Sequence, residues 1–195
     1  MTHTSGQTLD RPAHVAARLR LSAAAHERTA ADVTQIVAAG DAMKTALGEG
    51  RTIFAFGNGG SAADAQHFVA ELVVRYEAER PGRAALALTT DTSILTAAGN
   101  DSGFEQVFAR QIEALGRRGD VALAITTSGT SPNVVRALES AGLRGMLTIA
   151  LTGCDGGEAG RLAVIHVNVP EQRTALAQEV HTTILHTWCE LIDGA

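Results

Sequence analysis

The sequence predicts an α/β fold in which five parallel strands form one sheet, with helices on both faces and a long helical segment at the N-terminus. Three observations support this prediction. Short apolar runs alternate with helix-like segments along the chain. The runs are continuously apolar, which is typical of strands buried on both faces. The length of 195 residues fits one domain.

The N-terminal part is expected to be helical. Residues 1–12 are polar and contain Gly6 and Pro12, so we expect a disordered tail there. From residue 13 to 47, alanines are frequent and apolar residues recur at helical spacing, which predicts one or two long helices. Gly40 is the candidate break. A single domain, including these helices, then covers residues 13–195.

The rest of the chain alternates between strands and helices. Strands are predicted at residues 52–56, 84–88, 121–125, 147–151 and 163–169. Helices are predicted at residues 61–76, 93–115, 133–141 and 175–192, the second interrupted near 99–103. Successive parallel strands need helical crossovers, so these helices should cover both faces of the sheet.

Composition limits the partners of the protein. The formal net charge is -5, and Lys and Arg are not clustered, so a general nucleic-acid binder is not expected. Only 4% of the residues are aromatic, so the core must consist of small aliphatic side chains. A small core of this kind is often completed by a second subunit. We therefore expect an oligomer.

The cysteines and the apolar runs indicate the compartment. The spacing of the two cysteines, Cys154 and Cys189, fits neither a disulfide framework nor a cysteine zinc site. No run approaches the roughly 18 apolar residues of a membrane span, and the N-terminus has no signal-peptide pattern. We expect a cytoplasmic protein that does not associate with membranes.

The first predicted strand is followed by the loop Gly-Asn-Gly-Gly-Ser, residues 57–61. Glycines let a ligand approach the backbone at the start of the next helix. Gly57, Gly59 and Ala62 also satisfy the dinucleotide-binding pattern. Asp91, the candidate ribose ligand, lies 34 residues after Gly57, where about 20 are expected. A simple tight turn is the remaining alternative, although three glycines exceed what a turn requires.

The third predicted strand leads into the loop Thr-Thr-Ser-Gly-Thr-Ser-Pro-Asn, residues 126–133. Ser131 and Pro132 suit the N-cap and first position of a helix. A capping role leaves the other four hydroxyls unexplained. Hydroxyls at a helix N-terminus can bind a phosphate monoester without cationic side chains. The chain has no Gly-Lys-Ser/Thr motif, which disfavours a nucleoside triphosphatase.

Other polar residues could supply chemistry. Residues 89–93 and 99–101 could bind sugar hydroxyls, although caps and turns use the same residue types. His67 and Glu71 share one helix face and could bind a metal, act as a base with its orienting partner, or form an ordinary solvated pair. The last helix carries a polar stripe that either faces a site or is helix surface: Gln178, Glu179, His181, His186 and Glu190.

Taken together, these motifs resemble the sugar isomerase (SIS) domain family and, within it, the phosphoheptose isomerases. The resemblance rests on residues 56–71, 88–101 and 127–131 and on Gln178-Glu179 with His186, and it extends from about residue 15 to the C-terminus. It implies a flavodoxin-like three-layer fold. It also implies a homotetramer with active sites shared between subunits and a Zn²⁺ ion in each site.

The resemblance further implies an aldose–ketose isomerase of heptose biosynthesis, which converts sedoheptulose 7-phosphate to D-glycero-D-manno-heptose 7-phosphate through a cis-enediol. Glu71 would be the catalytic base and His186 the acid. The implied zinc ligands are His67, Glu71, Gln178 and His186. The implied substrate-binding residues are Asn58, Gly59, Gly60, Ser61, Glu71, Asn100, Asp101, Thr126, Thr127, Ser128, Ser131 and Gln178.

Helix geometry raises a question about this ligand set. Gln178 and His186 are eight positions apart, about 12 Å along a regular helix. Either the helix begins after Gln178 or the ligands are arranged differently, with His181 as a reserve ligand. The sequence also departs from the family pattern at Leu176, where a basic residue is frequent, and at Thr126, where the family has serine. These departures bear on substrate choice.

A non-catalytic function is the alternative. A relative of these isomerases is a regulator that binds the bacterial replication initiator protein, and residues 76–81 and 152–158 resemble it. The regulator lacks the helix-borne glutamate and the second histidine. Both are present here, as Glu71 and His186, so we favour the isomerase.

Overall fold

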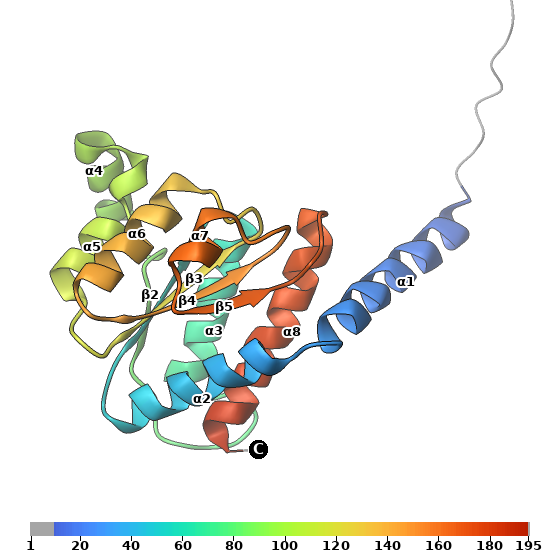
Figure 1. The fold of residues 1–195 in the computed structure, drawn as a ribbon, viewed down its shortest axis with the longest axis horizontal. Helices are drawn as coiled ribbons and strands as arrows, with labels where there is room; N and C mark the ends of the chain where they lie inside the picture. The colour runs from blue at the N-terminus through green and yellow to red at the C-terminus, as the bar shows by residue number, and fades with distance from the viewer. Residues whose placement is uncertain (1–9, 195) are drawn as a thin grey trace, which may run out of the picture.

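The computed structural model describes residues 10–194 and contains one parallel sheet (Figure 1). The strands are β1 (Ile53–Gly57), β2 (Ala85–Ala87), β3 (Val121–Thr126), β4 (Leu147–Thr152) and β5 (Ile165–Asn168). All neighbouring strands pair in parallel, in the order β2-β1-β3-β4-β5. This is the flavodoxin-like order. The predicted five-stranded fold class is confirmed.

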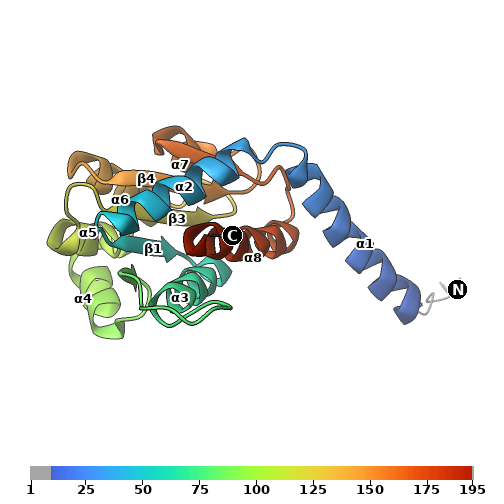
Figure 2. The same cartoon turned by 90° about the horizontal axis from the view of Figure 1, so that it is seen from below.

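Helices cover both faces of the sheet (Figure 2). One face carries α2 (Thr34–Gly48), α3 (Gly60–Val73) and α8 (Thr174–Asp193). The other carries α5 (Ala109–Leu115), α6 (Pro132–Leu143) and α7 (Gly157–Leu162). Strand side chains alternate between two cores: Ile53 packs in the first and Phe54 in the second. This two-sided burial is why the strands are continuously apolar.

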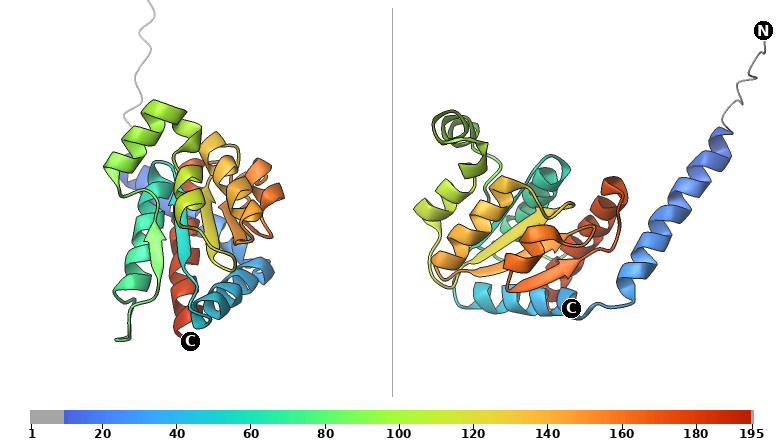
Figure 3. Two further views of the ribbon diagram at one scale, coloured as in Figure 1. Left: turned by 90° about the vertical axis from the view of Figure 1, so that its left-hand side faces the viewer. Right: turned by 45° about the horizontal axis from the view of Figure 1, so that its top comes forward.

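The helix α1 (Arg11–Ala30) projects from the domain (Figures 1 and 3). The Asp10 carboxylate caps it by accepting a hydrogen bond from the Ala13 N–H, at 3.2 Å. The predicted tail falls mostly on residues 1–9, which lie outside the described part of the chain. Residues 11 and 12 are already helical, because a cap and a proline in the first turn favour a helix start.

Gly40 does not end a helix. The break between α1 and α2 falls at residues 31–33, and Gly40 lies inside α2. A Cβ atom there would lie 2.6 Å from Leu191 Cδ1 and 3.3 Å from Trp188 Cδ1. The glycine therefore allows α2 and α8 to approach closely. The Trp188 indole N–H donates to the carbonyl of Ile36 at 2.8 Å, which fixes the same contact.

The interruption predicted near 99–103 is found at Gly103, which has φ 94°. It divides the predicted helix 93–115 into α4 (Thr92–Ser102), the 3-10 helix η1 (Phe104–Gln106) and α5. The short α7 was not predicted, and β5 begins after it. Within residues 10–194, no helix is both long and apolar enough to cross a membrane.

Candidate active site

The loops after β1 and β3 meet in a pocket at the carboxyl edge of the sheet. They come together because these strands are parallel neighbours. The pocket has a volume of about 290 Å³ and also receives the start of α8. Its lining includes nine of the predicted substrate residues: Asn58, Gly59, Gly60, Ser61, Thr126, Thr127, Ser128, Ser131 and Gln178. The structure thus brings together the glycine loop and the hydroxyl loop.

The helices that follow the two loops also begin at this pocket. The helix α3 starts after Gly59, which has φ 56°, and α6 starts after Ser131. Ser131 occupies the predicted N-cap position. Within residues 10–194, however, its side chain makes no capping hydrogen bond. A helix N-terminus carries partial positive charge and favours an anion. The pocket therefore suits a phosphate group held by hydroxyls and helix ends.

An amide pair that the sequence analysis missed joins the two loops. Asn58 and Asn133 exchange two side-chain hydrogen bonds, both at 2.8 Å. Asn133 is 2% exposed, so its side of the pair is shielded from water, while Asn58 is half-buried. The Thr126 hydroxyl accepts from the Gly129 N–H at 3.3 Å and shapes the second loop. An asparagine directly after a Ser-Pro cap was the available signal, but its partner is 75 residues away.

Gln178 lies against the glycine loop. A Cβ atom at Gly60 would be 2.4 Å from the Gln178 side-chain nitrogen. A methyl group there would displace this amide. Glycine at position 60 therefore lets the Gln178 amide on α8 lie against the loop.

A second group of polar side chains lies farther along the same two helices. His67 Nε2 is 3.2 Å from Glu71 Oε1 and 3.3 Å from His186 Nε2. The two imidazole rings meet edge to face, with centroids 4.9 Å apart. Tyr76 stacks on His186 with a centroid distance of 5.4 Å. The structure thus brings together the predicted base, the predicted acid and a further histidine.

The side chains of this second group include donors that zinc prefers. Ligands of a tetrahedral zinc ion with bonds near 2.0–2.1 Å lie about 3.3 Å apart. The spacings of His67 from Glu71 and from His186 match this value. Within residues 10–194, however, no three His, Cys, Asp or Glu side chains are already arranged around a cation position. The donors fit zinc by type and by these two spacings.

Gln178 does not join this group within one chain. The helix α8 is continuous from Thr174, so it does not begin after Gln178. Gln178 and His186 are therefore separated by about 12 Å along the axis. His181, the reserve ligand, is fully buried, and its Nε2 lies 3.0 Å from the carbonyl oxygen of Thr152. Burial lowers the pKa of His181 to about 4. The four predicted ligands thus divide between two places.

A carboxylate that the sequence analysis missed lies between the two groups. Asp64 Oδ1 accepts a hydrogen bond from the Thr182 hydroxyl at 3.3 Å. Its Oδ2 is buried and has no hydrogen-bond partner in residues 10–194. Burial raises the pKa of Asp64, against the opposing effects of Thr182 and His67. The spacing of four from Gly60 to Asp64 and from Gln178 to Thr182 was the available signal.

These contacts define a polar seam between α3 and α8, which run side by side (Figure 2). We use this name for three successive pairs across the two helices: Gly60 with Gln178, Asp64 with Thr182, and His67 with His186. The pocket lies at one end of the seam. Glu71 lies at the other.

Asn100 and Asp101 lie outside the pocket of their own chain. They are exposed near the end of α4, and the Asn100 amide donates to the Asp101 carboxylate at 2.7 Å. None of residues 92–102 is buried. Asp91, the ribose ligand of the dinucleotide interpretation, instead caps α4 by accepting from the Ile94 N–H at 2.9 Å.

The chain is similar to sugar isomerase proteins over most of its length. The family model described as the SIS domain matches residues 19–153. The chain is 55% identical over 161 residues to the phosphoheptose isomerase of Halorhodospira halophila, with 81% of each chain covered. It is 50% identical over 184 residues to that of Bradyrhizobium sp., with 93% of each covered.

Solved structures agree. The phosphoheptose isomerase GmhA from Neisseria gonorrhoeae matches with a TM-score of 0.88 and 44% identity, covering 94% of this chain and 99% of that one. A phosphoheptose isomerase from Francisella tularensis matches with a TM-score of 0.90 and 38% identity, covering 96% and 100%. The chain is therefore an SIS-domain enzyme and belongs to the phosphoheptose isomerase family.

Proposed function

We propose that this enzyme converts sedoheptulose 7-phosphate to D-glycero-D-manno-heptose 7-phosphate through a cis-enediol, with assistance from Zn²⁺. The observation that carries the proposal is the polar seam. It joins a pocket suited to a phosphate monoester to a carboxylate and two imidazoles suited to proton transfer. Relatives named for this reaction share most of the chain.

The pocket would hold the phosphate and part of the sugar. Hydroxyls of residues 126–131 and the N-terminus of α6 can bind the phosphate without a cation. The Asn58 amide and the Gln178 amide lie beside them and can bind sugar hydroxyls. Holding both ends of the substrate fixes its reacting carbons relative to the catalytic groups.

Proton transfer is assigned to the other end of the seam. Moving the carbonyl from C2 to C1 requires removal of a proton from C1 and its return at C2. Glu71 is the proposed base, and His186 is the proposed acid that protonates the oxygen at C2 as the enediol forms. His67 contacts both groups and can orient them. The same His67 contact keeps the Glu71 carboxylate directed toward the imidazoles.

His67, Glu71 and His186 are the residues that would hold the zinc ion. When bound, Zn²⁺ supplies Lewis-acid polarisation of substrate oxygens. Gln178 would complete the set only if it came from a partner subunit or if the start of α8 shifted. The proposal therefore assigns Gln178 to the substrate pocket within its own chain.

We further propose a cytoplasmic homotetramer with shared active sites. Asn100 and Asp101 are exposed and lie outside their own pocket, so they could reach substrate only in a neighbouring subunit. The helix α1 exposes Val15 and Leu19 at 57% and 67%, which leaves apolar surface for a partner to cover. Both cysteines are free, as is usual in a reducing compartment.

Glu71→Gln tests the function directly. With zinc added, the purified wild type should isomerise sedoheptulose 7-phosphate, and the variant should lose about 10²- to 10⁴-fold in kcat with an unchanged circular dichroism spectrum. Removing the metal with a chelator should lower wild-type turnover, and zinc should restore it. Glu139→Gln, which removes an exposed ion pair with Arg136, serves as the control and should retain activity.

Two results would contradict the proposal. Full activity of Glu71→Gln would remove Glu71 as the base. An inactive wild type that binds the bacterial replication initiator protein tightly would instead favour the non-catalytic regulator.

A further inference from the structure

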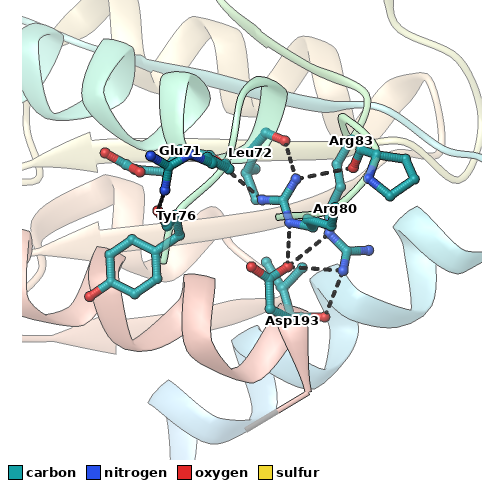
Figure 4. Close-up of polar contacts among 9 residues, drawn as sticks. Glu71, Leu72, Tyr76, Arg80, Arg83 and Asp193 are labelled. Atoms are coloured by element: carbon teal, nitrogen blue, oxygen red, sulfur yellow. Dashed lines mark hydrogen bonds and ion pairs between the residues drawn. The ribbon is translucent and has the colours of Figure 1, made fainter. Parts of the chain in front are cut away.

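The connection between α3 and β2 folds back against the active-site helices. We propose that Arg80, on this connection, is a positioning residue for the isomerase reaction. Its guanidinium holds the last turn of α3, which carries Glu71, against the end of α8, which carries His186 (Figure 4). The inference rests on the proposed function, because it concerns the alignment of the proposed base and acid.

The Arg80 side chain binds backbone carbonyls at the end of α3. Its Nη2 donates to the carbonyl of Glu71 and its Nη1 to the carbonyl of Leu72, both at 2.8 Å. Carbonyls in the last turn of a helix lack partners within the helix. The Arg83 N–H also donates to the Leu72 carbonyl, at 3.0 Å. The turn that carries the proposed base is therefore held by side-chain and backbone donors from the same connection.

The same guanidinium binds the end of α8. Arg80 Nε donates to Asp193 Oδ1 at 2.6 Å, and Arg83 Nη2 donates to the same oxygen at 3.0 Å. Asp193 is the last residue of α8, where the helix dipole disfavours a carboxylate. Its Oδ2 is buried and has no hydrogen-bond partner in residues 10–194. The negative charge of Asp193 is tolerated there because Arg80 and Arg83 neutralise it.

The connection also contacts the proposed acid. The Tyr76 ring stacks on the His186 ring at an interplanar angle of 29°. Continuous helix joins His186 to Asp193 over about 10 Å. Fixing Asp193 therefore fixes the axial position of His186 as well. One segment thus determines the relative position of both proposed catalytic side chains.

Arginine is required by the number and geometry of the acceptors. The Arg80 side chain is only 11% exposed, and its planar head meets three carbonyls, those of Glu71, Leu72 and Pro81, and one carboxylate at once. Lysine cannot reproduce this fork. Arg80 does not line the substrate pocket. Its loss should therefore impair the alignment of Glu71 more than the binding of substrate.

The test compares Arg80→Gln and Arg80→Lys with a matched control, Asp120→Asn. Asp120 is also buried, and it accepts from the Thr52 N–H and the Arg117 N–H at 2.9 Å, directly before β3 and away from the substrate pocket. Arg80→Gln should lower kcat about 10- to 100-fold, because misplacement by about 1 Å has that effect. KM should change less than about twofold. The kcat of Arg80→Lys should lie between those of wild type and Arg80→Gln.

Asp120→Asn should lower the melting temperature and leave kcat unchanged below it. The inference is overturned if Arg80→Gln retains kcat within about twofold, or if Asp120→Asn at equal stability loses as much kcat. If Arg80→Gln does not fold, Asp193→Asn replaces it, since the amide keeps the shape and an acceptor but removes the charge. Unchanged kcat in a folded Asp193→Asn would also overturn the inference.

Hydrogen exchange separates this inference from the proposed function. The amides of residues 73 and 74 should exchange faster in Arg80→Gln than in wild type, and Asp120→Asn should leave them protected. An inactive wild type would overturn the proposed function and with it the role of Arg80 in the reaction. An active wild type with an unimpaired Arg80→Gln would overturn the inference alone.

Discussion

His181 should make the protein lose stability in mild acid. The imidazole is fully buried, and its Nε2 donates to the Thr152 carbonyl. Its Nδ1 is also buried and has no partner in residues 10–194, so a second proton would have no acceptor. Burial lowers the pKa of His181 from 6.5 to about 4. The native protein therefore keeps this side chain neutral at pH values where the unfolded chain protonates it.

The sign and size of the pH effect on the free energy of unfolding follow from the difference between the native and unfolded pKa values of His181. Above pH 6.5 neither state binds the proton, so the free energy of unfolding does not depend on this group. As the pH falls below 6.5 the unfolded chain gains the proton, and stability is lost down to about pH 4, where the native state also protonates. The total loss is about 3 kcal/mol, of which about 2 kcal/mol has occurred at pH 5.

Urea unfolding at pH 7.5 and pH 5.0, at one fixed protein concentration, would measure the effect in wild type and in His181→Gln. At pH 7.5, the difference in the free energy of unfolding between wild type and His181→Gln gives the packing cost of the substitution. The remaining difference in pH dependence isolates the titration, because other groups are common to both proteins. Wild type should lose about 2 kcal/mol more than the variant. Equal losses in the two proteins would refute a neutral, buried His181.

Two glycine substitutions test the pocket. Gly60→Ala should raise KM by displacing the Gln178 amide, which would lie 2.4 Å from the new methyl group; steady-state kinetics with an unchanged KM would contradict this contact. Gly129→Ala should cost about 2 kcal/mol or more, because φ is 69° and the methyl group would lie 2.0 Å from the carbonyl oxygen of Gly156. Gly142→Ala, with no atom within 4 Å, should instead stabilise α6 by up to about 1 kcal/mol; equal denaturant midpoints for these two variants would argue against the close approach.

Much of the fold could be predicted because local sequence and tertiary burial agree. Each strand is an apolar run that ends at a polar loop, and both properties can be recognised without contacts. The helix α7 could not be predicted, since Gly-Glu-Ala-Gly-Arg-Leu has no apolar periodicity. It forms where its Ala159 N–H donates to the Gly129 carbonyl at 2.9 Å. The Gly40 prediction failed for a related reason, because only the contact with α8 explains that glycine.

The candidate site was predictable where it follows strand ends. Loops after neighbouring parallel strands must meet, so the glycine loop and the hydroxyl loop were expected together. The partners of Asn58 and Asp64 could not be predicted, because they lie 75 and 118 residues away in the sequence. The resemblance to a family assigned Gln178 and His186 to one ion. Only the continuity of α8 separates them within a chain.

The polar seam follows from the topology of the sheet. The helix α3 leaves β1 and α8 follows β5, and both begin at the carboxyl edge on the same face, so they run parallel. On parallel helices, positions spaced by about four residues meet at matching levels. The proposed phosphate-binding end and the proposed proton-transfer end are thereby held about 12 Å apart along α8. A substrate anchored by its phosphate in the pocket must be long enough to reach Glu71, and we expect this separation to favour a seven-carbon chain.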